Sequence, residues 1–138
     1  MNKNLFLLAL ALTLSCSANQ GPLKHPMDKS ESKTIKLENG LKVYLLSDPD
    51  FNVCAASMSV EVGSYQDPDN RQGMAHFLEH MLFLGTEKYP DVDEYSTYLK
   101  TFGGYSNAYT AGDHTNYQLQ VLPDGFEGSL DRFAQFFI

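Results

Sequence analysis

Two histidines and a glutamate, His76, Glu79 and His80, interrupt residues 74–84, a stretch that is otherwise apolar. On a helix the two histidines lie one turn apart, so both imidazole rings can reach one metal ion at about 2.0–2.1 Å from each nitrogen. Glu79 lies one position before His80 and flanks such an ion without having to bind it. Nitrogen ligands beside a carboxylate base favour zinc over calcium or magnesium. The spacing therefore predicts a zinc ion held by His76 and His80.

The chemistry that this arrangement predicts is hydrolysis of an amide by an activated water molecule. Zinc lowers the pKa of a water that it binds to about 7, and Glu79 would take the proton and pass it to the leaving amine. The alternative is a wet flank on which the three side chains are simply solvated. The apolar remainder of the helix predicts burial. Because burying these groups unpaired would be costly, metal binding is the favoured interpretation.

The residues around this helix predict the elements that hold it in place. Asn39-Gly40 joins two strand-like runs, which is a typical hairpin signal, and residues 53–62 alternate with a period of two that puts Cys54 on the buried face. The expected elements in order are strands over 34–37, 41–46 and 53–62, helices over 72–84 and 91–102, strands over 106–111 and 115–122, and a helix from Gly125 onward. This order predicts an α+β fold, a mostly antiparallel sheet with helices packed on one face.

Composition limits the class of protein. The 138 residues include 17 acidic and 10 basic side chains, a formal net charge of −7, and 43% of the residues are hydrophobic. These values are typical of a single globular domain, and the acidic balance argues against nucleic acid as a partner. Two cysteines cannot build a disulfide framework, and a redox role for Cys54 is not expected.

The first residues predict an export signal. Lys3 precedes an apolar run, residues 5–14, that is too short to cross a bilayer core of about 30 Å. Residues 12–16 resemble a bacterial lipobox, so Cys16 is expected to be lipidated and to attach the protein to a membrane; ordinary cleavage after Ala18 is the alternative. In either case export to the bacterial periplasm is expected. The expected division is a signal peptide over residues 1–15 and a polar linker over residues 16–33.

The sequence around the histidine pair resembles a known family. His76-Phe77-Leu78-Glu79-His80 has the pattern of the inverted zinc motif H-x-x-E-H of the inverzincins. Residues 73–86 as a whole are similar to the pitrilysin and insulin-degrading-enzyme family of metallopeptidases. The likeness covers roughly residues 34–138 and continues through Tyr89-Pro90, Glu94-Tyr95, Ser106–Thr110, His114–Tyr117 and Leu130–Phe137.

The resemblance implies roles for particular residues. His76 and His80 would be the zinc ligands, and Glu79 the general base, of a zinc metalloendopeptidase that acts on peptides or small proteins. The family also has an edge strand that pairs with an extended substrate, and the residues that match it are Asn107, Ala108 and Tyr109. An open sheet edge offers main-chain hydrogen bonds to a peptide; the alternative for these three residues is ordinary strand and turn structure.

The family's third zinc ligand is a glutamate on a later helix, farther from His80 than this sequence extends. Glu127 and Asp131 have suitable side chains, but both are expected on exposed faces of the last helix. His114 matches no ligand position and is expected to be structural. The resemblance thus implies that residues 34–138 are the truncated N-terminal part of a metallopeptidase domain, which needs missing C-terminal domains for a complete site. Alone, they should bind zinc weakly and cleave no peptide.

Two other functions share part of the pattern. The S-ribosylhomocysteine lyases use the same five-residue motif but need a cysteine after it, and no cysteine follows His80. A non-catalytic periplasmic lipoprotein or peptide-binding remnant would use the strand edge without hydrolysis. The intact Glu79 between two ligand-like histidines favours a catalytic parent.

Overall fold

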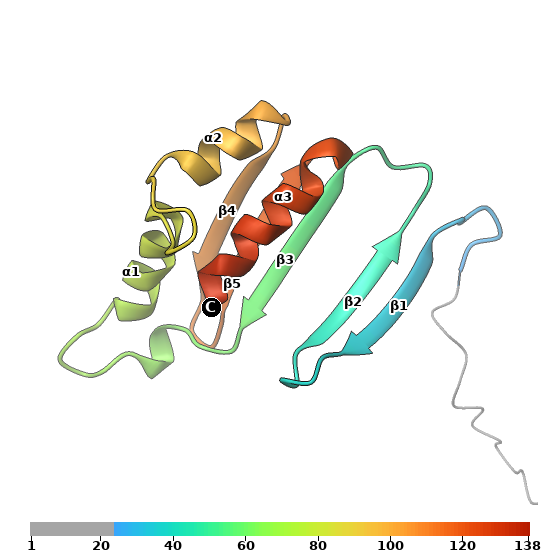
Figure 1. Cartoon of the computed structure of the whole chain (residues 1–138). Coiled ribbons are helices and arrows are strands. Elements are labelled where there is room, and N and C mark those ends of the chain that lie inside the picture. The colour runs from blue at the N-terminus through green and yellow to red at the C-terminus, as the bar shows by residue number, and fades with distance from the viewer. Residues whose placement is uncertain (1–23) are drawn as a thin grey trace, which may run out of the picture.

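The computed structural model describes residues 24–138, so the expected signal peptide and Cys16 lie outside the described residues. The described chain forms two antiparallel sheets and three α-helices (Figure 1). The elements in order are β1 (Glu31–Lys36), β2 (Lys42–Ser47), β3 (Cys54–Val60), α1 (Met74–Met81), α2 (Glu94–Thr101), β4 (Tyr105–Thr110), β5 (Thr115–Val121) and α3 (Pro123–Ala134). Short 3-10 turns precede α1 at Ser64–Gln66 and extend α1 and α3 at Leu82–Leu84 and Gln135–Phe137.

Strands β1 and β2 form the hairpin that the Asn39-Gly40 pair predicts. Gly40 has φ of 91°, a conformation that favours glycine, and its amide donates to the Leu37 carbonyl at 2.9 Å. The hairpin is longer than expected, because β1 begins at Glu31 and pairs it with Ser47 at the end of β2. Residues 31–33 of the expected linker therefore belong to a strand.

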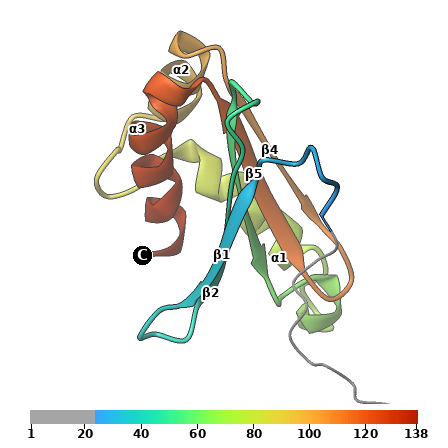
Figure 2. The same cartoon turned by 90° about the vertical axis from the view of Figure 1, so that its right-hand side faces the viewer.

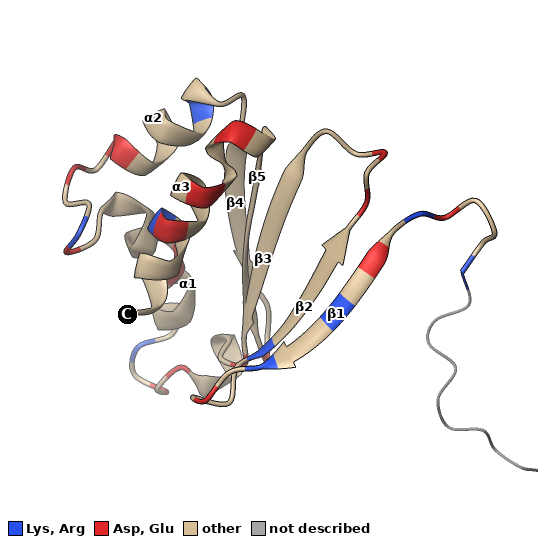
Figure 3. Cartoon of the chain, turned by 45° about the vertical axis from the view of Figure 1, so that its right-hand side comes forward, with Lys and Arg blue, Asp and Glu red and all other residues tan. Residues whose placement is uncertain are grey.

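The second sheet has the order β3-β5-β4, and both pairings are antiparallel. Strand β5 is central, which leaves β4 at one edge. Side chains alternate between a covered face and an open face, as the two-residue period predicts. Cys54 lies half-buried on the covered face. None of the three strands carries a Lys, Arg, Asp or Glu residue, and Figure 3 shows charged residues confined to the hairpin, helices and loops.

The helices pack against one face of this sheet, as the order of elements predicts. Helix α3 lies across β3 and β5, α2 packs against α3 and β4, and α1 contacts β4 and β5. Figure 2 shows α2 and α3 on the same side of the sheet. Between the layers lies an aromatic-rich core made of Tyr95, Leu99, Tyr117, Leu119, Val121, Phe133 and Phe136. None of the described helices is long and apolar enough to cross a membrane.

Candidate metal centre

Helix α1 carries the histidine pair, and an aspartate fixes where this helix begins. Gly73, with φ of 89°, turns the chain into the helix. The Asp67 carboxylate accepts hydrogen bonds from the amides of Gly73 at 2.7 Å and Ala75 at 2.9 Å. A carboxylate at this end satisfies amides that have no partner within the helix and interacts favourably with the helix dipole. This anchor was not predicted from the sequence, because Asp67 lies well before the helix, in a stretch that reads only as a polar turn.

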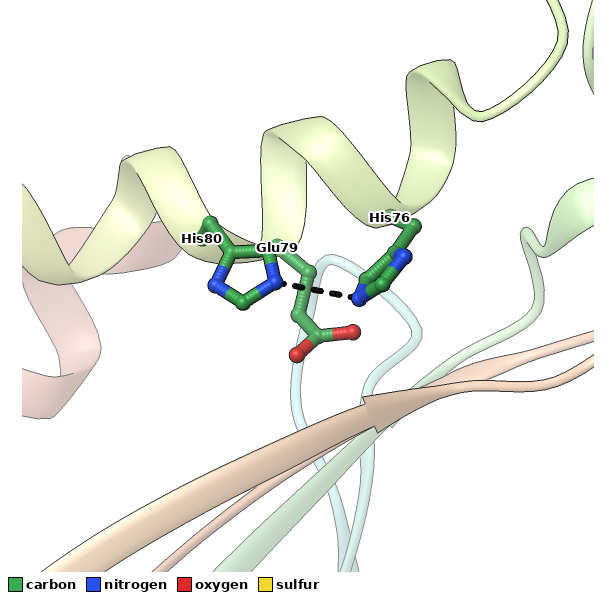
Figure 4. Close-up of side chains that lie close together, drawn as sticks. All are labelled: His76, Glu79 and His80. Carbon is green, nitrogen blue, oxygen red and sulfur yellow. Dashed lines mark hydrogen bonds between the residues drawn. The ribbon is translucent and has the colours of Figure 1, made fainter.

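His76 and His80 project from α1 with their rings close together (Figure 4). Their Nε2 atoms are 3.0 Å apart, close enough to share one proton or one cation. The ligand atoms of His76, Glu79 and His80 all lie within 4.8 Å of one another. Both histidines are exposed to solvent, whereas Glu79 is only 5% exposed.

The expectation that the whole helix is buried is wrong. Phe77 is 66% exposed and Leu78 is 56% exposed, although both are large apolar side chains. The physical reason is that the described neighbours of α1, which are β4, β5 and the 3-10 turn at Ser64–Gln66, leave Phe77 and Leu78 open to solvent. The structure therefore has features of both the buried and the solvated interpretation of this flank. The two histidines are exposed to solvent, and the Glu79 carboxylate is buried.

The buried Glu79 carboxylate has a defined partner. Its Oε2 atom accepts a hydrogen bond from the Thr110 hydroxyl, at 2.5 Å, so the charge is buried with compensation. Tyr117 lies nearby on the central strand. Burial, and secondly the negative charge of Glu79, raise the pKa of the Tyr117 phenol above its ordinary value. The role of Thr110 was not predicted from the sequence, although the strand period places it on the same face as Ala108.

The donor set fits a zinc ion. Two nitrogens bound to one tetrahedral ion at about 2.0–2.1 Å would lie about 3.3 Å apart, and the two Nε2 atoms are 3.0 Å apart. Neutral imidazoles are common zinc ligands, and solvent exposure leaves room for further ligands on the outer side. The residues present can therefore hold zinc through His76 and His80, with Glu79 beside them.

No other His, Cys, Asp or Glu within residues 24–138 joins this group. Asp131 is occupied elsewhere, because its carboxylate accepts hydrogen bonds from Lys88 Nζ, at 2.7 Å, and from the Tyr89 hydroxyl. These two hydrogen bonds lower the pKa of Asp131 below its ordinary value. Glu127 is exposed on α3, as expected. Neither acidic residue is brought to the histidine pair.

Strand β4 places the residues expected to bind substrate beside α1. Asn107 and Tyr109 are exposed on the open face, while Ala108 is half-buried on the covered face that α1 packs against. Among the described elements β4 pairs only with β5, so its second edge is free for main-chain hydrogen bonds. His114, in the turn after β4, lies 2.7 Å from the Asp113 carboxylate and 3.4 Å from the Tyr109 hydroxyl. It is not part of the metal-ligand group.

Comparison with known proteins gives consistent similarities. The family model described as "Insulinase (Peptidase family M16)" matches residues 42–138. Insulin-degrading enzyme-like 1, peroxisomal, from Arabidopsis thaliana is 57% identical over 116 residues, which is 84% of this chain and 12% of that protein. Human insulin-degrading enzyme is 52% identical over 115 residues, or 83% of this chain and 11% of that protein. The crystal structure of pitrilysin superposes with a TM-score of 0.78 at 41% identity, covering 83% of this chain and 12% of that one. The chain thus spans about an eighth of the length of these relatives.

Proposed function

Because this chain belongs to peptidase family M16, the insulinase family, we propose that it supplies the metal-binding part of a zinc metalloendopeptidase that hydrolyses peptides. The observation that carries the proposal is the arrangement on α1, where a buried carboxylate lies beside two exposed imidazole nitrogens 3.0 Å apart. The relatives named insulin-degrading enzyme support a peptide or small protein as the substrate.

In this proposal each residue has a separate task. His76 and His80 would hold the zinc. When bound, zinc supplies Lewis-acid chemistry, polarising the scissile carbonyl and making water more acidic. Glu79 accepts the proton from the attacking water at its carboxylate and returns it to the leaving amine. Burial of Glu79 keeps this carboxylate in one place, since a solvated side chain would sample many rotamers.

The edge of β4 supplies the binding surface. An extended peptide would pair with the main chain of Asn107, Ala108 and Tyr109 and thereby add a strand to the sheet. Because α1 packs against β4, such a peptide would lie close to the histidine pair. Main-chain pairing does not depend on the substrate's side chains, so this surface fits a range of peptide sequences.

The proposal includes a third protein ligand, because a catalytic zinc takes three and leaves one position for water. The two histidines are the ligands available on α1, and neither Glu127 nor Asp131 reaches them. We assign the third ligand to further polypeptide of the parent protein, which is consistent with a relative in which the 116 matched residues are only 12% of the length. The same proposal includes export through residues 1–15 and anchoring by lipidated Cys16. Cys16→Ala should then release the protein into the soluble periplasmic fraction, and unchanged membrane association would contradict the anchor.

The test of the proposed function starts from protein purified from its own cells, whose intact mass gives the true chain length. A mass several times 15.4 kDa would mean that the native protein has further polypeptide, which can contain the third ligand and further domains. That protein should hydrolyse a quenched peptide, and Glu79→Gln should lower kcat by about 10²–10⁴-fold while zinc stays bound. Glu87→Gln, at an exposed loop position, is the matched control and should retain full activity. Equal hydrolysis by both variants would overturn the role of Glu79. A native chain that ends at Ile138 and cleaves nothing would instead support the non-catalytic remnant.

A further inference from the structure

Thr110, the last residue of β4 in the sheet, contacts the side chain of Glu79 on helix α1. The Thr110 hydroxyl donates to Glu79 Oε2 at 2.5 Å, and this contact joins α1 to the sheet. In this contact the Thr110 hydroxyl is the donor and the Glu79 oxygen is the acceptor. The sheet therefore determines, through Thr110, where the Oε2 atom of Glu79 lies.

A neighbouring threonine, Thr115, is the other hydroxyl near Thr110. Thr115 pairs with Thr110 across the β4–β5 turn, is only 4% exposed, and has its hydroxyl oxygen 3.4 Å from that of Thr110. The Thr115 proton is used elsewhere, because the hydroxyl donates to the Val62 carbonyl at 2.8 Å. Each hydroxyl has one proton. The Thr110–Glu79 contact, at 2.5 Å, is much shorter than the 3.4 Å that separate the two hydroxyl oxygens, so the Thr110 proton is directed to Glu79.

Threonine suits this position better than a flexible donor would. A β-branched side chain on a strand has few χ1 rotamers, so its hydroxyl points in one direction. We infer that Thr110 is a positioning residue, which orients the Glu79 carboxylate for proton transfer without touching substrate or metal. This inference rests on the proposed function of Glu79. It also gives β4 two tasks, because the same strand carries Asn107–Tyr109 at the peptide edge and Thr110 at the base.

The first test compares three variants of the full-length protein, loaded with zinc. Thr110→Val keeps the shape of the side chain and removes the hydroxyl, so kcat on a quenched peptide should fall about 10–100-fold with KM unchanged. Thr110→Ser keeps the hydroxyl and should recover activity to within about threefold of wild type. Thr101→Val removes an exposed threonine hydroxyl on α2, which donates to the Thr97 carbonyl, and serves as the control for the same substitution elsewhere.

A double-mutant cycle separates positioning from a general structural effect. If Thr110 acts only through Glu79, then Thr110→Val should cause no further loss of kcat in a Glu79→Gln background. The unfolding equilibrium constant of the metal-free protein gives a second readout that needs no activity. Thr110→Val should raise this constant in both backgrounds. The increase should be about tenfold larger when Glu79 is present than in the Glu79→Gln background.

Each outcome of these measurements supports or overturns the inference. Full activity of Thr110→Val, while Glu79→Gln is inactive, would overturn the role of Thr110 and leave the proposed function standing. An equal loss from Thr110→Val and Thr110→Ser, or additive losses in the cycle, would also overturn it. Peptide hydrolysis that survives Glu79→Gln would overturn both proposals. If Thr110→Val does not fold, Thr110→Ala removes the same hydroxyl with a smaller side chain and takes its place in the activity comparison and in the unfolding cycle.

Discussion

Arg132 of α3 binds the carboxylate of Glu94 in the first turn of α2. The guanidinium donates from Nη2 to Oε1 at 2.6 Å and from Nε to Oε1 at 2.8 Å. Its carbon Cζ also lies 3.7 Å from the centre of the Tyr98 ring and 4.4 Å from that of Tyr89. The Arg132 side chain is only 15% exposed, so this ion pair is shielded from water and salt. One side chain thus ties α3, α2 and the segment before α2 together.

Arg132→Lys should destabilise the protein although it keeps the charge. Lysine cannot donate both hydrogen bonds from one planar group or stack flat on the tyrosine rings, so the free energy of unfolding should fall by about 1–3 kcal/mol. Chemical denaturation measures this change. Lys29→Ala removes an exposed ion pair with Asp50 and is the control, expected to cost under about 1 kcal/mol. Equal losses from the two substitutions would show that the buried geometry contributes nothing.

Asp67→Ala should loosen the start of α1. The amides of Gly73 and Ala75 would lose their acceptor, at a cost of about 1 kcal/mol typical of a lost helix N-cap. Hydrogen exchange of these two amides should become faster, while exchange in β5 changes only through the small loss of global stability. Asp69→Ala, an exposed aspartate in the same turn, should leave both amides protected. Unchanged protection in Asp67→Ala would show that this carboxylate does not anchor the helix.

Tyr95 makes stability depend on alkaline pH. Burial raises the pKa of the Tyr95 phenol from its ordinary value of 10.0 to about 12. Between these two values the unfolded chain loses the proton and the folded chain keeps it. Unfolding therefore releases a proton there, and the free energy of unfolding falls as pH rises, by about 2 kcal/mol at pH 12. Below pH 10 this contribution does not vary.

Tyr95→Phe isolates this effect from the titration of exposed lysines. The Tyr95 hydroxyl is buried and has no hydrogen-bond partner among the described residues. Its removal should therefore change the free energy of unfolding at pH 7 by less than about 1 kcal/mol. Above pH 10 the variant should become the more stable protein. Denaturation curves at pH 7, 10 and 11.5 would measure both effects. An equal fall in the free energy of unfolding of variant and wild type as pH rises would contradict the shifted pKa of Tyr95.

His80→Ala should remove half of the proposed zinc pair. Losing one of two nitrogen ligands should lower zinc affinity by at least about 100-fold, because ligands contribute jointly to a chelate. A competition assay with a coloured chelator measures the affinity. His114→Ala is the matched control, because His114 contacts Asp113 and Tyr109 and lies outside the metal-ligand group. Zinc affinity that falls equally in both variants would place the metal elsewhere.

Local features of this protein could be predicted from sequence, and contacts between distant segments could not. The facing of His76 and His80 follows from helix geometry alone, and the hairpin at Asn39-Gly40 follows from turn chemistry. The exposure of Phe77 was not predictable, because an apolar side chain does not specify what covers it. The bonds to Glu79 from Thr110 and to Asp67 from Ala75 span 31 and eight residues, and no period in the sequence marks such pairs.

His76 and His80 are four residues apart in the sequence, whereas Glu79 and Thr110 are 31 residues apart. This difference has a consequence for the order of folding. Turn formation within α1 alone brings His76 and His80 together, and a helical turn forms in about a microsecond or less. Glu79 meets Thr110 only after the chain closes a much longer loop and β4 has docked. Closure of long loops and pairing of distant strands are the slow steps of folding. The two proposed zinc ligands can therefore come together on a nascent helix before Thr110 orients the Glu79 carboxylate.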